Sequence, residues 1–552
     1  MYDSNGRHPE TINQYRCALL IGLRRSFTRF IRTIRYLKLI QILNRIQRKV
    51  WKPRLSLTKF PFLKPGLPQM EFPAYFDSWD GADGFTFLNE SHQIQSAADW
   101  NNAAWLKLWL YNLHYFDCLR QKNRATGQSE STLILRWIQD NPPTDGSGWE
   151  PYPLSLRIVN WIKWRLAGYG ELSPEMIESL ALQTRFLRGQ LEYHLLANHL
   201  LANAKALIFA GRLFQGTEAD GWFEKGWSLY QQQLPEQILP DGSHFERSVM
   251  YHAIILEDLL DVFSILPDED KRIWLCPFVE RMLGFLVKMT GPDGRIALFN
   301  DAAWGIAQEP AVLLDYAARL GFRIPALDEV LSRGQDGADY IRMSSGDLTL
   351  FSDVGAIGPD YQPGHAHADT LSFELFEGRK RLMVDTGTSC YGVSAVRLKE
   401  RGTAAHNTVR IDGRDSSEVW SGHRVGQRAR IVRRVQAVDS LTACHDGYRP
   451  LLHERTWRWL SNGLSIHDRL EGSGRHSVEI FFHFHPDIKV EQTALNAVKL
   501  NDKWTLHCSK GQVTVVDSHW SSEFGKRVPC KVAVIRLSEV LPCEVVSGVE
   551  FG

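Results

Sequence analysis

The chain has 552 residues, of which 44% are hydrophobic and 23% charged, and its formal net charge is +1. This length exceeds that of a single hydrophobic core and predicts two or three domains, while the near-neutral balance gives no general attraction to nucleic acid. The eight cysteines are scattered and form no CxxC pair, so they predict neither a disulfide framework nor a thiolate zinc site. The 18 tryptophans suit a carbohydrate-binding cleft, although core packing is the commoner role of this residue.

Residues 12–50 predict a basic amphipathic helix, and a Pro-containing connector (51–69) follows it. Asp3 and Glu10 are the only acidic residues before residue 56. Such a helix either makes peripheral contact with an anionic membrane or packs on its own protein with its arginines in water, and we favour the second arrangement. No segment reaches transmembrane length and no cleavable signal peptide is evident, which predicts a cytoplasmic protein.

From about residue 98 to 335 the apolar residues recur at helical spacing. Helices are predicted at 100–120, 155–169, 174–195, 198–214, 251–266 and 278–289. Turns such as 143–148, 239–242 and 291–294 separate them. Repeated helix pairs of this kind are compatible with an α/α toroid or a solenoid.

After about residue 340 the sequence changes to short alternating strands, for example at 347–353, 478–486, 504–508, 512–518 and 531–537. This pattern predicts an antiparallel β domain, most simply a sandwich. The expected divisions are 1–95 for the N-terminal helix and connector, 96–338 for the helical domain and 339–552 for the β domain.

Three places in the helical half carry polar residues suited to chemistry. Asn198 and His199 begin an apolar helix, where Asn198 also suits a helix cap. The other two places contribute Tyr111, His114 and Tyr115, and Glu246, Arg247 and Tyr251. Each residue alone is more often a satisfied core group than a catalyst, but together they predict a cleft between the domains.

The β half contributes a dense set of histidines and carboxylates at 364–409, namely His365, His367, Asp369, Asp385 and His406. On a strand, His365 and His367 point to the same face. Two imidazoles and a carboxylate from neighbouring strands are the usual ligands of zinc, and buried hydrogen-bonded histidines are the alternative. A second pair, His483 and His485, we interpret as strand residues facing a polar cavity.

The segments NHLLANAKALIFAGRLF, DGSHFERSVMYH, GHAHADTLSFELF, VDTGT and AHNTV, in this order, resemble the heparinase II/III-like polysaccharide lyases. The resemblance covers most of the chain. It implies an incomplete α/α toroid followed by an antiparallel β-sandwich, and β-elimination on a uronic-acid-containing polysaccharide. It also makes a periplasmic location an alternative to the cytoplasmic one.

The resemblance gives the matched residues their roles. Asn198 and His365 neutralise the uronate carboxylate, whereas His199 and Tyr251 are the base and the acid, in an order that depends on the uronate epimer. Tyr251 can do both if it starts as a phenolate, which requires nearby positive charge. Zinc, mainly structural, is assigned to His367, Asp385 and His406. One departure is Ala202, where family members often carry Glu.

The substrate is expected to be an acidic polysaccharide held locally, since the whole chain is almost neutral. Arg247, Arg397 and Arg401 are the candidates for a bidentate grip on carboxylate or sulfate. Two alternatives to an active lyase remain: a glycan-binding pseudoenzyme, and a zinc hydrolase that activates water. The sequence gives no oligomeric state.

Overall fold

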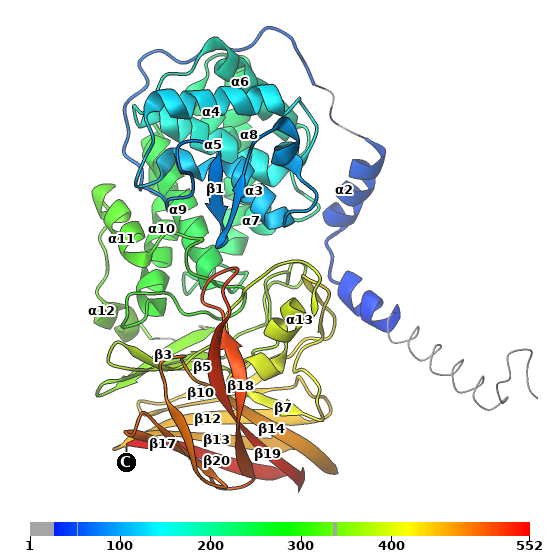
Figure 1. Cartoon of the computed structure of the whole chain (residues 1–552), viewed down its shortest axis with the longest axis vertical. Coiled ribbons are helices and arrows are strands. Elements are labelled where there is room, and N and C mark those ends of the chain that lie inside the picture. The colour runs from blue at the N-terminus through cyan, green and yellow to red at the C-terminus, as the bar shows by residue number, and fades with distance from the viewer. Residues whose placement is uncertain (1–26, 52, 54, 335–338, 552) are drawn as a thin grey trace, which may run out of the picture.

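A computed structural model describes residues 27–51, 53, 55–334 and 339–551, and it separates the chain into a helical part and a β part (Figure 1). Residues 12–26 of the predicted N-terminal helix, with Cys17, lie outside the described residues. The remainder of that helix is two helices, one at 27–34 and α2, with a break at 35–38. None of the described helices is long and apolar enough to cross a membrane.

The helices are α2 (Leu39–Val50), α3 (Lys107–Tyr115), α4 (Gly127–Asp140), α5 (Pro151–Leu166), α6 (Pro174–Arg188), α7 (Ala197–Leu213), α8 (Thr217–Gln237), α9 (Val249–Ile265), α10 (Glu269–Met289), α11 (Pro310–Arg319), α12 (Leu327–Ser332) and α13 (Ala395–Arg401). Those between α3 and α11 form the toroid, which a short hairpin of β1 (Gly84–Phe87) and β2 (Glu90–Gln93) joins. The single helix predicted at 100–120 is interrupted at Phe116, whose left-handed backbone (φ 63°) ends α3.

Helix α7 is almost entirely buried, in contact with α5, α8 and α9. Two glycines allow it to approach α8 closely. A Cβ at Gly211 of α7 would lie 2.7 Å from the Ala219 carbonyl oxygen, and one at Gly226 of α8 would lie 2.6 Å from that of Ala204. Neither backbone oxygen can move aside, so this close packing fixes the position of α7.

The β domain contains three larger sheets whose strands pair antiparallel. The eight-stranded sheet has the order β10 (Ile431–Gln436), β11 (Ser440–His445), β12 (Leu452–Leu460), β13 (Gly463–Glu471), β20 (Cys543–Phe551), β17 (Trp504–Cys508), β16 (Ala497–Leu500), β15 (Val490–Ala494). The two four-stranded sheets are β18 (Gln512–Trp520), β19 (Val528–Val540), β14 (Arg475–His483), β7 (Val409–Ile411), and β3 (Tyr340–Ser345), β4 (Leu348–Asp353), β5 (Phe373–Glu377), β6 (Lys380–Met383). The hairpin β8 (Val419–Trp420) and β9 (Arg424–Val425) completes the domain.

The two parts share a hydrophobic core. Phe351 and Phe376 of the β3–β6 sheet, with Trp520 and Phe524, belong to the same buried cluster as the toroid helices. The inner faces of all three larger sheets form a second cluster. The architecture is therefore a helical toroid followed by an antiparallel β-sandwich, as predicted, and the shared core holds the domain boundary in place.

Candidate active site

A cavity of about 570 Å³ lies between the toroid and the β domain. Asn198 and His199 of α7, Tyr251 of α9 and His365 of the β domain all line it. The structure thus brings together, from three segments, the four side chains to which the family resemblance assigns catalytic roles. His365 and His367 lie in a loop before β5, not on a strand as expected.

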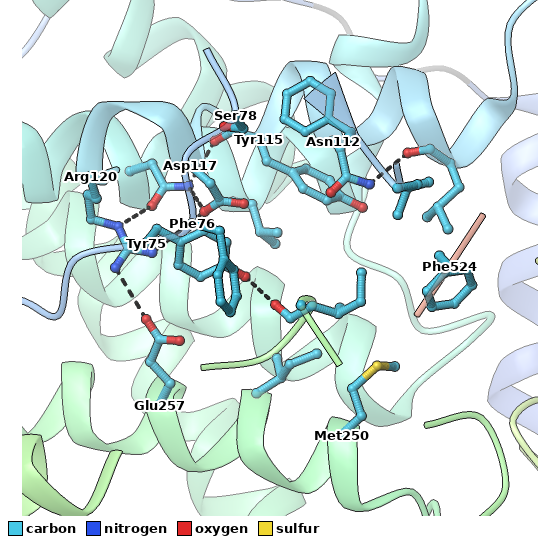
Figure 2. Close-up of a pocket in the computed structure, with 18 of the residues that line it drawn as sticks. Tyr75, Phe76, Ser78, Asn112, Tyr115, Asp117, Arg120, Met250, Glu257 and Phe524 are labelled. Atoms are coloured by element: carbon cyan, nitrogen blue, oxygen red, sulfur yellow. Dashed lines mark hydrogen bonds and ion pairs between the residues drawn. The ribbon is translucent and has the colours of Figure 1, made fainter. Parts of the chain in front are cut away.

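A second cavity of about 370 Å³ lies in the toroid (Figure 2). It continues from the first, since Tyr115, Tyr152, Tyr251 and Tyr391 line both. Its charged wall is internally paired. Arg120 donates to Glu257 at 3.2 Å, as Figure 2 shows, and Lys205 donates to Asp258 at 2.6 Å. Aromatic rings and paired polar groups along one continuous space suit an extended glycan chain.

The start of α7 is held in an unusual backbone conformation. Leu196 and Ala197 have φ values of 65° and 51°, a region that costs free energy for residues other than glycine. The Asn198 backbone N–H donates to Glu246 at 3.0 Å, and its side-chain Nδ2 contacts both Glu246 oxygens at 2.9 and 3.0 Å. The buried carboxylate of Glu246 therefore stabilises the helix terminus that carries Asn198 and His199.

His199 is oriented by a carboxylate. Its Nδ1 lies 3.1 Å from Oε1 of Glu192, whose other oxygen accepts from Asn203 at 3.0 Å. Burial lowers the pKa of His199, but the charge and hydrogen bond of Glu192 outweigh it, so the pKa is raised above its ordinary value. With Nδ1 engaged, Nε2 is the ring nitrogen left for a substrate in the cavity.

Tyr251 stacks on His365 with a ring-centroid distance of 3.9 Å, and its hydroxyl lies 3.2 Å from that of Tyr391. Burial, followed by the neighbouring Tyr391, raises the pKa of Tyr251 well above its ordinary value. The condition for a phenolate, an excess of nearby positive charge, is therefore not met. Tyr251 is a neutral phenol in this structure and can give a proton.

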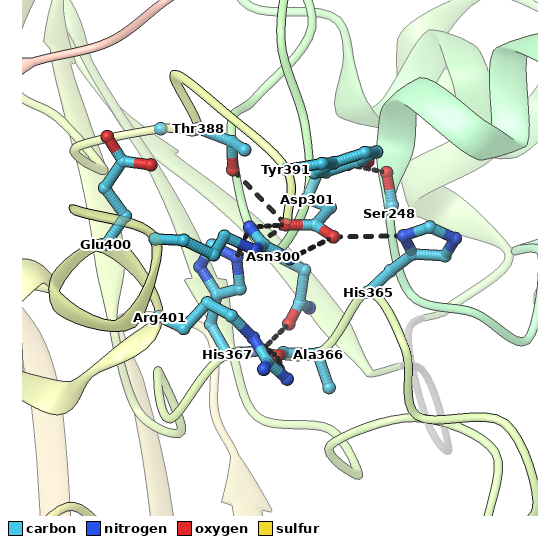
Figure 3. Close-up of polar contacts among 12 residues, drawn as sticks. Ser248, Asn300, Asp301, His365, Ala366, His367, Thr388, Tyr391, Glu400 and Arg401 are labelled. Carbon is cyan, nitrogen blue, oxygen red and sulfur yellow. Dashed lines mark hydrogen bonds and ion pairs between the residues drawn. The ribbon is translucent and has the colours of Figure 1, made fainter. Parts of the chain in front are cut away.

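Asp301 is the centre of a buried network that joins both domains (Figure 3). Its carboxylate contacts Nδ1 of His365 at 3.0 Å and Nε2 of His367 at 2.9 Å, and it forms a bidentate pair with Arg397. Burial opposes the ionised form, but Arg397 and the two histidines hold the pKa of Asp301 well below its usual range. The other ring nitrogen of His365 lies 3.1 Å from Glu246, so the network connects Asp301 to Asn198.

None of the three arginines predicted to grip the substrate lines either cavity. Arg397 is fully buried on Asp301, and the equally buried Arg401 donates to the carbonyl oxygen of Ala366 at 2.8 Å. Arg247 forms an ion pair with Asp339. These arginines hold the loops around the site, because the buried carboxylate and carbonyl groups of those loops require partners.

The other predicted substrate residues divide into two groups. Tyr111 and Tyr115 line the larger cavity, with the Tyr111 hydroxyl donating to Glu150. Glu246 is buried behind Asn198. His114 lies outside both cavities: its Nε2 is 3.0 Å from the Trp100 carbonyl oxygen, its Nδ1 accepts from Trp137 at 3.0 Å, and burial lowers its pKa to about 3.

A possible metal-binding group lies behind the cavity. Ligand atoms of Asp369, Asp385 and His406 lie within 4.8 Å of one another, and the rings of His406 and His367 are 5.3 Å apart. Three atoms of this group are buried without a hydrogen-bond partner: Nδ1 of His367, Oδ2 of Asp369 and Nε2 of His406. Burial lowers the pKa of His367 to about 4, which leaves its ring neutral. Unpartnered nitrogen and oxygen donors around two buried carboxylates fit a divalent cation.

The second histidine pair has other partners. His483 ends β14 with its Nε2 3.0 Å from the Ala404 carbonyl oxygen, and His485 packs on Trp520 with a centroid distance of 4.6 Å.

Several residues of the site were not predicted from the sequence. Asp301 follows an apolar run as part of an Asn-Asp pair, which is a weak signal for a buried carboxylate. Tyr391 lies inside the histidine-rich stretch, whereas Tyr152, Glu192 and His423 carry no signal beyond their residue type. The tertiary fold alone brings them to the site.

Comparisons with known proteins identify the family. The family profile described as heparinase II/III N-terminus matches residues 135–318, and the one described as heparinase II/III-like, C-terminal matches residues 332–547. The chain belongs to the heparinase II/III-like family. It is a polysaccharide lyase. No curated protein matches the sequence.

Solved structures share the fold at low identity. A heparinase III crystal structure is 16% identical, with a TM-score of 0.65, over 93% of this chain and 89% of that one. A mutant heparan sulfate lyase from Pedobacter heparinus is 17% identical, with a TM-score of 0.58 and coverages of 93% and 88%. A chondroitin AC lyase from Streptomyces coelicolor, in complex with chondroitin sulphate, is 11% identical, with a TM-score of 0.50 and coverages of 81% and 75%.

Proposed function

We propose that this lyase cleaves a uronic-acid-containing polysaccharide by β-elimination and leaves an unsaturated uronate end. The observation that carries the proposal is the convergence of Asn198, His199, Tyr251 and His365 on one cavity. The similarity to heparinase III, heparan sulfate lyase and chondroitin AC lyase structures makes glycosaminoglycans the first polymers to test.

The first requirement of the reaction is a neutralised carboxylate, because the intermediate formed when C5 loses its proton carries further negative charge onto that group. We assign this role to Asn198 and His365, which line the cavity and both contact Glu246. Glu246 and Asp301 act as positioning residues for these two groups, and because Glu246 engages both the Asn198 amide and Nε2 of His365 in this structure, the substrate carboxylate would have to take over those contacts.

We assign the base to His199 and the acid to Tyr251. Glu192 raises the pKa of His199 and so makes its free Nε2 a stronger acceptor for the C5 proton. Burial keeps the Tyr251 phenol protonated, which suits the donor of a proton to the O4 leaving group. The C5–H and C4–O bonds break, the C4–C5 double bond forms, and the two protons pass through His199 and Tyr251.

Two other arginines replace the predicted ones as anion-binding candidates. Arg45 of α2 and Arg424 of β9 both line the larger cavity, and neither guanidinium has a carboxylate partner within the part of the chain that the structure describes. Burial and the charge of Arg424 lower the pKa of Arg45, so the two cations repel each other. A sulfate or carboxylate bound between them would remove this repulsion.

We further propose that zinc binds at His367, Asp385 and His406, with Asp369 as an additional ligand. The neutral His367 ring and the unpartnered donor atoms support this choice. When bound, the ion would link the 364–369 loop, the end of β6 and the segment before β7, which makes its role structural.

A panel of uronate polysaccharides, followed at the ultraviolet absorbance of the unsaturated product, tests the reaction. A carboxyl-reduced form of the best substrate should not be cleaved, because reduction removes the group that acidifies the C5 proton. Cleavage of that polymer with formation of an unsaturated end would rule out uronate β-elimination, and cleavage without new absorbance would support the zinc hydrolase.

A chelator separates the hydrolase from the lyase. A hydrolase loses its reaction as soon as the metal leaves, whereas a lyase with structural zinc first loses stability. Binding of the polymer with no turnover of any panel member would support the pseudoenzyme. The presence of all four catalytic side chains argues against that alternative.

A further inference from the structure

We define residues 27–51 as the N-terminal arm. In its helix α2, the polar face contacts the protein and the apolar face points outward, the reverse of an ordinary surface helix. Gln41 is its one fully buried residue, and its side chain donates to the carbonyl oxygens of Leu195 and Tyr361 at 3.3 Å. Two arginines on the same side of α2 also reach the toroid: Arg45 donates to His194 at 3.3 Å and Arg48 to Gln190 at 3.0 Å. The polar face of α2 is therefore the face that docks on the protein.

The apolar face of α2 is left in water. Leu39, Leu43, Ile46 and Val50 recur at intervals of four and three residues, so they form one stripe opposite Gln41. Their exposed fractions are 69%, 56%, 57% and 81%. The helix docks on its own protein, as expected from the sequence, but in α2 the expected face is wrong: the polar side makes the contacts and the apolar side lies in water. An apolar stripe held outward by a fixed polar face requires another partner.

Charge indicates which partner fits. Residues 1–55 contain 13 Lys and Arg against 2 acidic residues, a net charge of +11. Because the full chain has a net charge of only +1, the remaining residues carry −10. The chain thus has one strongly basic end and an acidic body. A negatively charged surface attracts the arm and repels the rest, which would orient the molecule on it.

We propose that the arm binds the surface of an anionic lipid bilayer, with Leu39, Leu43, Ile46 and Val50 inserted at the level of the headgroups. Apolar side chains gain nothing from a hydrated acidic polysaccharide, which excludes the substrate as the partner of this stripe. A second copy of the arm, whose seven Lys and Arg and absence of acidic residues give it a charge of +7, would bring two such charges together, which disfavours self-association. A bilayer surface satisfies both the apolar stripe and the charge.

The arm also contributes to the active site. Phe30, Ile34 and Leu37 line the larger cavity together with Arg45. Arg29 forms an ion pair with Glu418 of the β domain at 3.0 Å, and Lys38 forms one with Glu236 of the toroid. The arm therefore bridges both domains, and a bilayer under its outer face would lie close to the larger cavity.

Sedimentation with lipid vesicles tests the proposal with the full chain. Vesicles of phosphatidylcholine with about one third phosphatidylglycerol should retain the protein, pure phosphatidylcholine vesicles should retain less, and salt should weaken retention. The double variant Leu43→Gln/Ile46→Gln should bind the anionic vesicles at least about tenfold more weakly, because it removes two inserted side chains.

The matched control is Ile273→Gln on α10, an isoleucine with the same degree of exposure (60%) outside the arm. It should leave vesicle binding unchanged, and both variants should keep wild-type lyase activity on soluble polymer and wild-type thermal unfolding. Unchanged vesicle binding by the double variant would overturn the proposal. So would no binding of the wild type to anionic vesicles, or a wild-type dimer that the double variant converts to a monomer.

Discussion

The helical and the loop-borne halves of the active site are held in different ways. Asn198, His199 and Tyr251 stand on α7 and α9, whose positions follow from helix packing deep in the toroid. His365 stands on a loop, and its position depends on the buried charges of Asp301 and Arg397. In the helical half, a substitution can therefore lower the reaction rate without changing the free energy of unfolding. In the loop-borne half, one substitution changes both.

The sharpest test of the helical half is Tyr251→Phe. Loss of the hydroxyl removes the proposed proton donor but keeps the ring on His365, so the rate of elimination should fall by roughly 10²–10⁴-fold with little change in thermal unfolding. Turnover and melting temperature are the measurements. Tyr391→Phe is the matched control, because its hydroxyl is the neighbour of the donor, and its effect should be smaller. Near-normal turnover by a folded Tyr251→Phe protein would contradict the assignment.

This division also explains how much the sequence could predict. Helical spacing of the apolar residues located α5, α7 and α9, and with α7 its first residues, while alternating apolar residues located strands such as β4, β17 and β18. The role of Arg397 could not be predicted, because the sequence around an arginine does not show whether its side chain faces substrate or a buried carboxylate such as Asp301. The outward apolar face of α2 was equally hidden, since periodicity gives a face but not its direction.

In the loop-borne half, Arg397→Ala should cost about 3–5 kcal/mol of unfolding free energy, because it leaves the Asp301 carboxylate buried without its cation. Chemical denaturation measures this loss, and the rate should fall as well, because His365 loses its anchor. Arg428→Ala is the control: Arg428 is 5% exposed, but its partner Asp360 is 69% exposed and stays hydrated. Equal losses for the two variants would show that Arg397 does not hold a buried charge.

The proposed zinc ligands also belong to the loop-borne half, so their loss should affect metal binding and stability together. His367→Ala or Asp385→Ala should lose bound zinc and stability together, by about 2.7 kcal/mol if free zinc is near 100 times its dissociation constant. Elemental analysis and thermal unfolding are the measurements. His483→Ala, a buried histidine that hydrogen-bonds a carbonyl oxygen nearby, should keep its zinc. Full zinc occupancy in both ligand variants would move the site, with His483 and His485 as the first candidates.

The smallest expected effect is a shift in the pH dependence of activity when Glu192, the positioning residue of the proposed base His199, is changed. Glu192→Gln keeps the size of the side chain but removes the charge that raises the pKa of His199. A base must be unprotonated, so activity falls as the pH drops through the pKa of His199, and in the wild type this limb lies above the ordinary histidine value of about 6.5. Without the charge the pKa falls and the limb of kcat/KM moves to lower pH. Glu150→Gln, which alters the carboxylate bonded to Tyr111 in the same cavity wall, should leave the limb in place. If the limb is unchanged in Glu192→Gln as well, His199 is not the base, and the proton at C5 must go to Tyr251.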